Sequence, residues 1–164
     1  MIEPRDVAEI AFETSDALRA LSLDIVTNCQ RTLDITSRHL DPMLFDNQAF
    51  VDAVKQLVLN SRLAKVRILV VDIQPVVSRG HRLIELASRL SSFITIRKPG
   101  NDYKHFNEAM LIADTLAYTH RRFADRYDGL GSHSDIRRAT DLTGRFEEIW
   151  QRAELDENFR RLHI

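Results

Sequence analysis

An apolar run at residues 65–72, Lys-Val-Arg-Ile-Leu-Val-Val-Asp, is the most clearly patterned stretch of the chain. A run this short and this rich in β-branched residues is typical of a strand buried on both faces, as in a parallel sheet. Segments with helical periodicity stand before and after it. This alternation predicts βαβ units, whose binding crevice lies at the carboxyl ends of the strands, where Asp72 stands.

Several other segments carry apolar residues three and four positions apart, the spacing of a helix with one buried face. We predict helices over residues 15–29, 47–63, 81–91 and 134–153. Phe146 and Trp150 fall on the apolar stripe of the last helix, so we assign them to the core. A weaker pattern predicts an N-terminal helical extension at residues 1–14.

Alternating or continuous apolar runs predict the remaining strands. These are residues 31–37, 93–97 and 109–114, with residues 115–122 as a hairpin partner. We interpret residues 73–80 as a loop and residues 128–131 as a flexible glycine-containing break, and we expect residues 154–164 to form a charged tail. The elements together predict an α/β fold with a mostly parallel central sheet flanked by helices.

The chain has 164 residues, 44% of them hydrophobic and 29% charged, which predicts a single globular domain over residues 1–164. The formal net charge is -1, which argues against broad, nonspecific binding to nucleic acid or membrane surfaces but allows a local basic patch. No apolar run reaches the roughly 20 residues that a membrane span needs. The single cysteine, Cys29, excludes an internal disulfide framework and fits a cytoplasmic protein.

The basic residues are 19 arginines and only 4 lysines. One explanation is a composition bias of the genome; the other is planar recognition of phosphate or carboxylate by guanidinium groups. The motifs of a P-loop, a dinucleotide-binding loop, a hydrolase nucleophile elbow and the common zinc sites are absent from the sequence. His39 with Asp41, or His81 with Asp72, offers only a pair of ligands, so we predict neither a metal nor a cofactor.

The segment Asn107-Glu-Ala-Met-Leu-Ile-Ala-Asp114, with the elements around it and the closing Phe146-Glu-Glu-Ile-Trp150, resembles one half of the phospholipase D superfamily. The resemblance covers about residues 17–153 and implies that family's α/β sandwich. Members carry His-x-Lys followed, after four residues, by Asp. Aligned on Asp114, this chain has Asn107 in place of the nucleophilic histidine and Ala109 in place of the lysine, and Arg121-Arg122 in place of a Gly-Ser pair.

The family chemistry implied by the resemblance therefore cannot operate here. The histidine attacks phosphorus and the lysine stabilises the phosphoryl oxygens, whereas an asparagine amide is a poor nucleophile and alanine has no donor. Only Asp114 matches, and we expect it to act as a turn or hydrogen-bonding group.

A second set of polar residues stands at the predicted strand ends and at the start of the following helix, where an anion such as phosphate or carboxylate could bind. We predict ligand-binding roles for Ser37, Arg38, Asp72, His81, Arg97, Asn107 and Asp114, on one edge of the sheet. The alternative is that the arginines are surface residues paired with carboxylates and that His81 caps or packs.

Three functions remain open from the sequence. The first is a catalytically inactive phospholipase D-like module that binds an anionic, phosphate-bearing ligand or a protein partner. The second is an enzyme with relocated chemistry, in which Asp72 orients His81 as base or nucleophile. The third is a homodimeric interaction domain without a small-molecule ligand, because active members of the superfamily bring two halves together about a pseudo-twofold axis. A nucleic-acid ligand is allowed by the sequence but not favoured.

Overall fold

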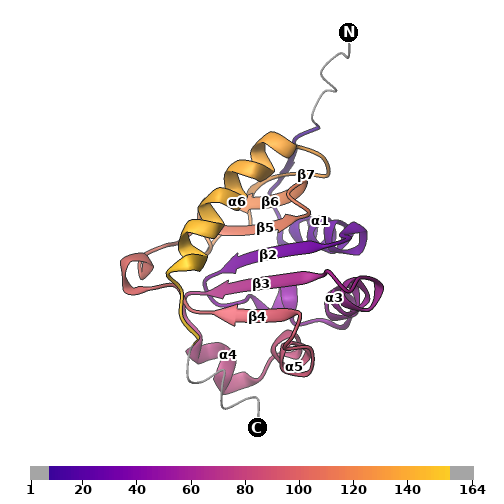
Figure 1. Cartoon of the computed structure of the whole chain (residues 1–164). Coiled ribbons are helices and arrows are strands. Elements are labelled where there is room, and N and C mark those ends of the chain that lie inside the picture. The colour runs from indigo at the N-terminus through magenta and orange to yellow at the C-terminus, as the bar shows by residue number, and fades with distance from the viewer. Residues whose placement is uncertain (1–7, 156–164) are drawn as a thin grey trace.

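The computed structural model describes residues 8–155 and places all its strands in one seven-stranded sheet (Figure 1). Across the sheet the strand order is β1-β7-β6-β5-β2-β3-β4. The strands are β1 (Ile10–Phe12), β2 (Thr32–Ser37), β3 (Lys65–Val70), β4 (Ile94–Arg97), β5 (Ala109–Ala113), β6 (Ala117–Arg121) and β7 (Gly129–Ser132). The helices are α1 (Ser15–Asn28), α2 (Pro42–Phe45), α3 (Gln48–Asn60), α4 (Gln74–Arg79), α5 (Arg82–Arg89) and α6 (Ile136–Gln151), with a 3-10 turn, η1, at Asn101–Tyr103.

The prediction of a mostly parallel sheet is wrong. Only β2, β3 and β4 run parallel, while β2 pairs antiparallel with β5 and the pairs β5–β6, β6–β7 and β7–β1 are antiparallel too. The parallel pairing of β2, β3 and β4 agrees with the βαβ units predicted from the sequence. The turn between β5 and β6 is too short for a crossover, so those strands must be antiparallel. The β2–β5 and β7–β1 pairs join strands that are far apart in the sequence, so no local pattern indicated their direction.

Helices cover both faces of the sheet, as an α/β sandwich requires. Apolar residues of α1, α3 and α5 form one large core with one face, and α6 forms a second core with the other (Figure 1). Strand β3 explains the unbroken apolar run of the sequence: Val66 and Ile68 belong to the first core, and Leu69 belongs to the second. Phe146 and Trp150 lie in the second core, as predicted.

Three local predictions are corrected by the structure. The helix expected up to residue 14 is not formed in its described part, where Ile10–Phe12 instead pair with β7; residues 1–7 lie outside the described residues. The expected loop at residues 73–80 contains α4, which Pro75 can begin because it needs no hydrogen-bond partner for its missing N–H. The expected glycine break is the strand β7.

Strand β7 needs its glycines because it passes very close to β6. A Cβ atom at Gly129 would lie 2.3 Å from the His120 carbonyl oxygen, and one at Gly131 would lie 2.7 Å from that of Tyr118. These glycines therefore serve close strand packing rather than flexibility.

The described part of the C-terminal tail pairs with the edge of β4. Lys98 and Glu154 form an antiparallel bridge through two backbone hydrogen bonds of 2.8 and 3.0 Å. The remainder of the predicted tail lies outside the described residues.

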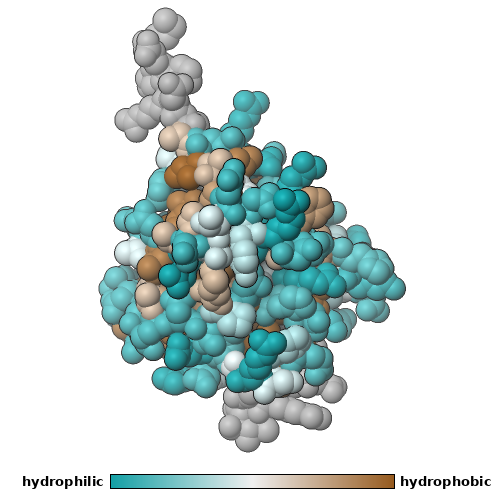
Figure 2. Space-filling model, turned by 180° about the vertical axis from the view of Figure 1, so that it is seen from behind, coloured by the Kyte–Doolittle hydropathy of each residue, from teal (hydrophilic) through white to brown (hydrophobic). Residues whose placement is uncertain are grey.

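None of the helices within residues 8–155 is long and apolar enough to cross a membrane. The face seen from behind is mostly hydrophilic, with its hydrophobic residues gathered mainly in the upper part of the view (Figure 2).

Candidate functional site

The carboxyl ends of β2, β3 and β4 and the amino end of β5 form one edge of the sheet, because β5 is antiparallel to β2. Ser37, Arg97 and Asn107 stand at this edge. Asp114 does not: it follows the far end of β5, where Ala113 pairs with Leu33 at the start of β2. The prediction that Asp114 joins the other candidates is therefore wrong, since it assumed that all the strands were parallel.

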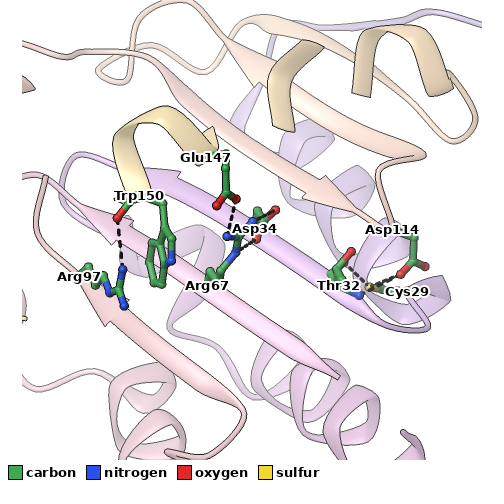
Figure 3. A network of polar contacts seen from close by, with 8 residues as sticks. All are labelled: Cys29, Thr32, Asp34, Arg67, Arg97, Asp114, Glu147 and Trp150. Carbon is green, nitrogen blue, oxygen red and sulfur yellow. Dashed lines mark hydrogen bonds and ion pairs between the residues drawn. The ribbon is translucent and has the colours of Figure 1, made fainter. Parts of the chain in front are cut away.

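Asp114 instead organises the opposite edge, as a hydrogen-bonding group in a turn. Its carboxylate accepts the backbone N–H groups of Gln30, Arg31 and Thr32 at 2.8, 2.8 and 3.0 Å. The Cys29 Sγ lies 3.7 Å from the same carboxylate (Figure 3). Burial, together with the nearby Asp114 charge, raises the pKa of the Cys29 thiol to about 12, so this cysteine stays protonated and unreactive.

Ser37 and His81 are engaged within the protein. The Ser37 hydroxyl accepts the Leu40 N–H at 2.8 Å. His81 caps α5: its Nδ1 accepts the Leu83 N–H at 3.1 Å, which leaves Nε2 to donate to the Leu40 carbonyl at 3.0 Å. Both side chains are buried, at 1% and 4% exposure. Burial lowers the pKa of His81, although the charge of Asp46 opposes that shift.

The predicted catalytic pair of His81 and Asp72 is not supported by these contacts. Both ring nitrogens of His81 are occupied, whereas Asp72 lies beside His39, with 3.7 Å between Oδ2 and Nδ1. A histidine with both nitrogens bound to backbone groups can neither accept a substrate proton nor attack phosphorus. The relocated chemistry expected of this pair therefore has no geometric basis.

Arg97 belongs to a set of cations that hold α6 on the sheet. Its guanidinium lies 4.3 Å from the centre of the Trp150 ring and donates to the Trp150 carbonyl at 3.2 Å (Figure 3). Beside it, Arg67 on β3 makes a two-pronged contact with Asp34, its register partner on β2, at 2.9 and 3.1 Å. Arg67 also contacts Glu147 of α6 at 2.6 Å.

The hydrogen bonds from Arg67 explain how the acidic residue Asp34 can be only 5% exposed. Burial raises the pKa of Asp34, and the hydrogen bonds from Arg67 work in the opposite direction. This pairing could not be predicted, because the pattern along a single strand does not show which residue lies opposite on the neighbouring strand.

Arg38, Asp72 and Asn107 are partly exposed, as is Arg97, whose guanidinium packs on Trp150. Arg38 reaches the Phe106 carbonyl at 3.4 Å, a weak contact that leaves its other donors available. A pocket of about 270 Å³ lies nearby, lined by residues that include His39, Arg79 and His81. The lining of this pocket does not include Arg38, Asp72 or Asn107.

The positions of the family's nucleophile and lysine lie on the α1 and α3 side of this edge. Ala109 pairs directly with Arg121 of β6, so the two side chains share one face. The Arg121 side chain is 3% exposed and contacts Asp41 at 3.2 Å. It also donates to the carbonyls of Ala124 and Arg126 at 3.1 and 3.0 Å. This guanidinium is therefore held by the protein itself through both terminal nitrogens.

The other face carries a polar network that the sequence analysis missed. His120 of β6 lies 3.4 Å from Glu108, and its Nδ1 accepts from Arg138 of α6 at 3.3 Å. Arg145 pairs with the other oxygen of Glu108. Burial lowers the pKa of His120, while Glu108 acts against that shift. The available signal was the spacing of Arg138 and Arg145, two helical turns apart on the same side of α6.

Within residues 8–155, no group of three or more histidine, cysteine, aspartate and glutamate side chains is arranged to hold a metal ion. The polar networks that we describe consist of arginine, histidine and carboxylate groups. Such sets suit the binding of anions better than the ligation of cations.

The fold is that of the phospholipase D superfamily. The structure matches Nuc from Salmonella typhimurium, a phospholipase D family member, with a TM-score of 0.64 and 10% identity over 91% of this chain and 97% of that one. NucT from Helicobacter pylori matches with a TM-score of 0.65 and 11% identity, over 90% and 98% of the two chains.

A third similar structure is TrmBL2, an archaeal chromatin protein that shows a novel mode of DNA binding. The TM-score is 0.64 with 18% identity, and the match covers 93% of this chain but only 56% of TrmBL2. No curated protein matches the sequence. The chain belongs to the DUF7931 family, a domain of unknown function, whose model matches residues 14–162.

Proposed function

We propose that this chain is a phospholipase D-like domain that has lost phosphodiester hydrolysis and serves as a binding module for a phosphate-bearing ligand. The observation that carries the loss of activity is the environment of Ala109. Its opposite neighbour, Arg121, is buried and held by Asp41 and two carbonyls, so its guanidinium cannot take over the role of the missing lysine.

The nucleophile is missing as well. Asn107 stands where the superfamily has its histidine, and its backbone carbonyl accepts the Ala124 N–H at 2.6 Å. His81, the candidate that the sequence offered for relocated chemistry, has both ring nitrogens engaged. Covalent attack on phosphorus therefore has no agent among these residues.

Two considerations support a role in binding. Arg38 keeps unused donors beside Asn107 and Asp72 at the edge that carries the active site in the superfamily. The same fold also occurs in TrmBL2, which binds DNA. A domain can keep the phosphate recognition of its fold after its catalytic groups are gone, because recognition needs only donors and positive charge.

The absence of turnover is tested with bis(p-nitrophenyl) phosphate as a chemically simple phosphodiester. We expect no release of nitrophenol above a buffer blank, with or without Mg²⁺. A protein-dependent rate that is lost in Arg38→Ala or Asp72→Asn would overturn the proposal, whereas a rate unchanged in both variants would identify a contaminating nuclease.

Binding is tested by thermal unfolding with AMP, inorganic phosphate and a short single-stranded oligonucleotide. A ligand that binds only the folded protein adds about 2.7 kcal/mol of stability at one hundred times its Kd, which moves Tm by several degrees. Flat unfolding curves with all three probes would count against a phosphate-binding role.

A second candidate role is self-association. The matches to Nuc and NucT span nearly the whole of those chains, so this protein corresponds to a single superfamily half, for which a twofold partner is expected. Light scattering after size-exclusion chromatography should then give twice the chain mass of 18.9 kDa. A monomer at high micromolar concentration would remove this candidate.

A further inference from the structure

A pocket of about 720 Å³ opens on the face of the sheet that α6 covers, away from the Arg121 guanidinium. Its lining includes Glu108 and His120 from the sheet, Arg138 and Arg145 from α6, and Phe123 from the loop after β6. Pockets of this size are typical of small-molecule sites. In Figure 1, α6 crosses this face next to β5 and β6.

The polar groups of the pocket are arranged to favour an anion. Glu108 is already paired with Arg145, and Asp128, another residue of the lining, pairs with Arg126 at 3.0 Å. The lining as a whole holds three arginines and three carboxylates, and among residues 8–155 no ion pair joins Arg122 or Arg138 to a carboxylate. Two guanidinium groups without a carboxylate partner suit phosphate oxygens, which two N–H donors can bind together.

His120 fixes the orientation of these groups. Because Arg138 can only donate, the Nδ1 atom of His120 must be the acceptor, and Nε2 then carries the proton that faces Glu108. The histidine side chain is 7% exposed, so its ring is held in place by its surroundings. Arg138 therefore starts from a defined position on an exposed helix face.

The rim of the pocket offers an aromatic surface. Phe123 is 51% exposed and Leu130 is 39% exposed, so both present apolar surface at the pocket. The loop that carries Phe123 is held at the next residue, where Ala124 donates to Asn107 and accepts from Arg121. A ring on a fixed loop can stack against a flat ligand without a large loss of entropy.

We propose that this pocket binds a nucleotide, with the phosphate on Arg138 and Arg122 and the base against Phe123. This inference rests on the proposed binding function and adds to it a site and a ligand class. The shared chemistry is a phosphate joined to an aromatic base, whether in a free nucleotide or in a single strand. Stacking on an aromatic ring beside basic groups is the usual way of binding single strands without strict sequence preference.

The test measures the affinity of the intact chain for AMP by calorimetry and for a short labelled oligothymidylate by fluorescence polarisation. For each probe that binds the wild type, Arg138→Gln should raise the Kd about tenfold, because it removes one charged donor. The glutamine keeps a group that can contact His120. It should also reduce the salt dependence of oligonucleotide binding by about one unit of slope. Phe123→Ala should weaken nucleotide binding by about fivefold or more and leave inorganic phosphate unaffected.

Arg62→Gln is the matched control, because Arg62 is exposed and lines none of the pockets described above. Its affinity should equal that of the wild type. Equal Tm values for Arg138→Gln and the wild type without ligand would show that the fold is retained.

Weaker binding in Arg138→Gln and Phe123→Ala supports the proposal. In that case, binding of AMP indicates that the ligand is a free nucleotide, whereas binding of the oligonucleotide alone indicates a nucleotide within a strand. Binding that is unchanged in both variants but lost in Arg38→Ala would overturn this pocket while leaving the proposed function in place. No binding of any phosphate-bearing probe would overturn both.

Discussion

Two neighbouring residues of β6, Arg121 and His120, lie on opposite faces of the sheet and have different surroundings. On the α1 and α3 side, Arg121 is 3% exposed, and its guanidinium is occupied by Asp41 and two backbone carbonyls. On the α6 side, the adjacent His120 accepts a hydrogen bond from Arg138, an exposed residue that lines an open pocket. The first face holds a guanidinium that is engaged within the protein, and the second holds an exposed guanidinium beside a pocket.

The difference shows that an arginine is not by itself a sign of binding. A buried guanidinium must have every donor satisfied by the protein, since an unpaired buried charge costs several kcal/mol. The donors of an exposed guanidinium are satisfied by water, which a phosphate can replace. Burial, rather than residue type, thus separates structural from binding arginines in this chain.

The largest expected effect follows from removing the engaged guanidinium of the first face. Arg121→Ala should lower the free energy of unfolding by about 3–5 kcal/mol, because it leaves Asp41 and two loop carbonyls without their donor. Urea denaturation followed by circular dichroism measures the change. Arg62→Ala serves as the exposed control, and a loss below about 1 kcal/mol in Arg121→Ala would mean that the guanidinium is not structural.

A pair of glycine variants tests the close packing of β7 on β6, next to the open pocket. Gly131→Ala should cost about 1–3 kcal/mol, since its Cβ would lie 2.7 Å from the Tyr118 carbonyl oxygen and 2.8 Å from Leu21 Cδ2. Gly144→Ala, on α6, meets nothing within 4 Å and should stabilise the helix by about 0.5–1 kcal/mol. Chemical denaturation of both variants checks the sign, and a neutral Gly131→Ala would contradict the close approach.

A pH series tests the buried histidine cap. The pKa of His81 is lowered in the folded state from its ordinary value of 6.5, so the unfolded chain binds its proton more readily. Its contribution to stability is complete above pH 6.5 and is lost as the pH falls towards the lower, folded pKa, with a slope of at most about 1.4 kcal/mol per pH unit. His120 shifts in the same direction.

The matched variant is His81→Asn, which keeps a capping oxygen for the Leu83 N–H but does not titrate. Stability measured between pH 7.5 and 5 should fall less steeply in this variant than in the wild type. Parallel curves would show that His81 is not the titrating group.

The smallest expected effect is that of Arg138→Ala without ligand. Arg138 is exposed and makes one side-chain contact, with His120, so its loss should change the free energy of unfolding by less than about 1 kcal/mol. A destabilisation as large as that of Arg121→Ala would remove the distinction between the two faces. The measurement is the same urea denaturation.

Most of the helices and strands could be predicted from the sequence because their patterns are local. Leu18, Leu21 and Ile25 lie on the buried face of α1, as the spacing of apolar residues indicated, and Thr14 caps that helix through its side chain. The departures lie where local pattern is uninformative. Gly129 and Gly131 predict a flexible break, yet they belong to strand β7, which pairs with β6. Only glycine fits so near the carbonyl groups of β6.

The candidate site was less predictable for a reason of topology. Ser37 and Arg97 lie at the predicted edge, but Asp114 does not, because the direction of β5 is decided by its pairing with β2. The partners of His81 were likewise invisible, since Leu40 lies far from it along the chain. Neither the direction of pairing nor a contact between distant segments leaves a periodic signal in the sequence.

The sequence by itself determined the α/β character, the resemblance to the phospholipase D superfamily and the presence of Asn107 and Ala109 where that resemblance implies histidine and lysine, because each depends on residue identity and local spacing. The tertiary structure alone decided which charges are satisfied. Strand register set Arg67 opposite Asp34 and Arg121 opposite Ala109, and the packing of α6 brought Arg138 to His120. Whether a charged group is structural or available to a ligand depends on burial and partners, which only the folded chain defines.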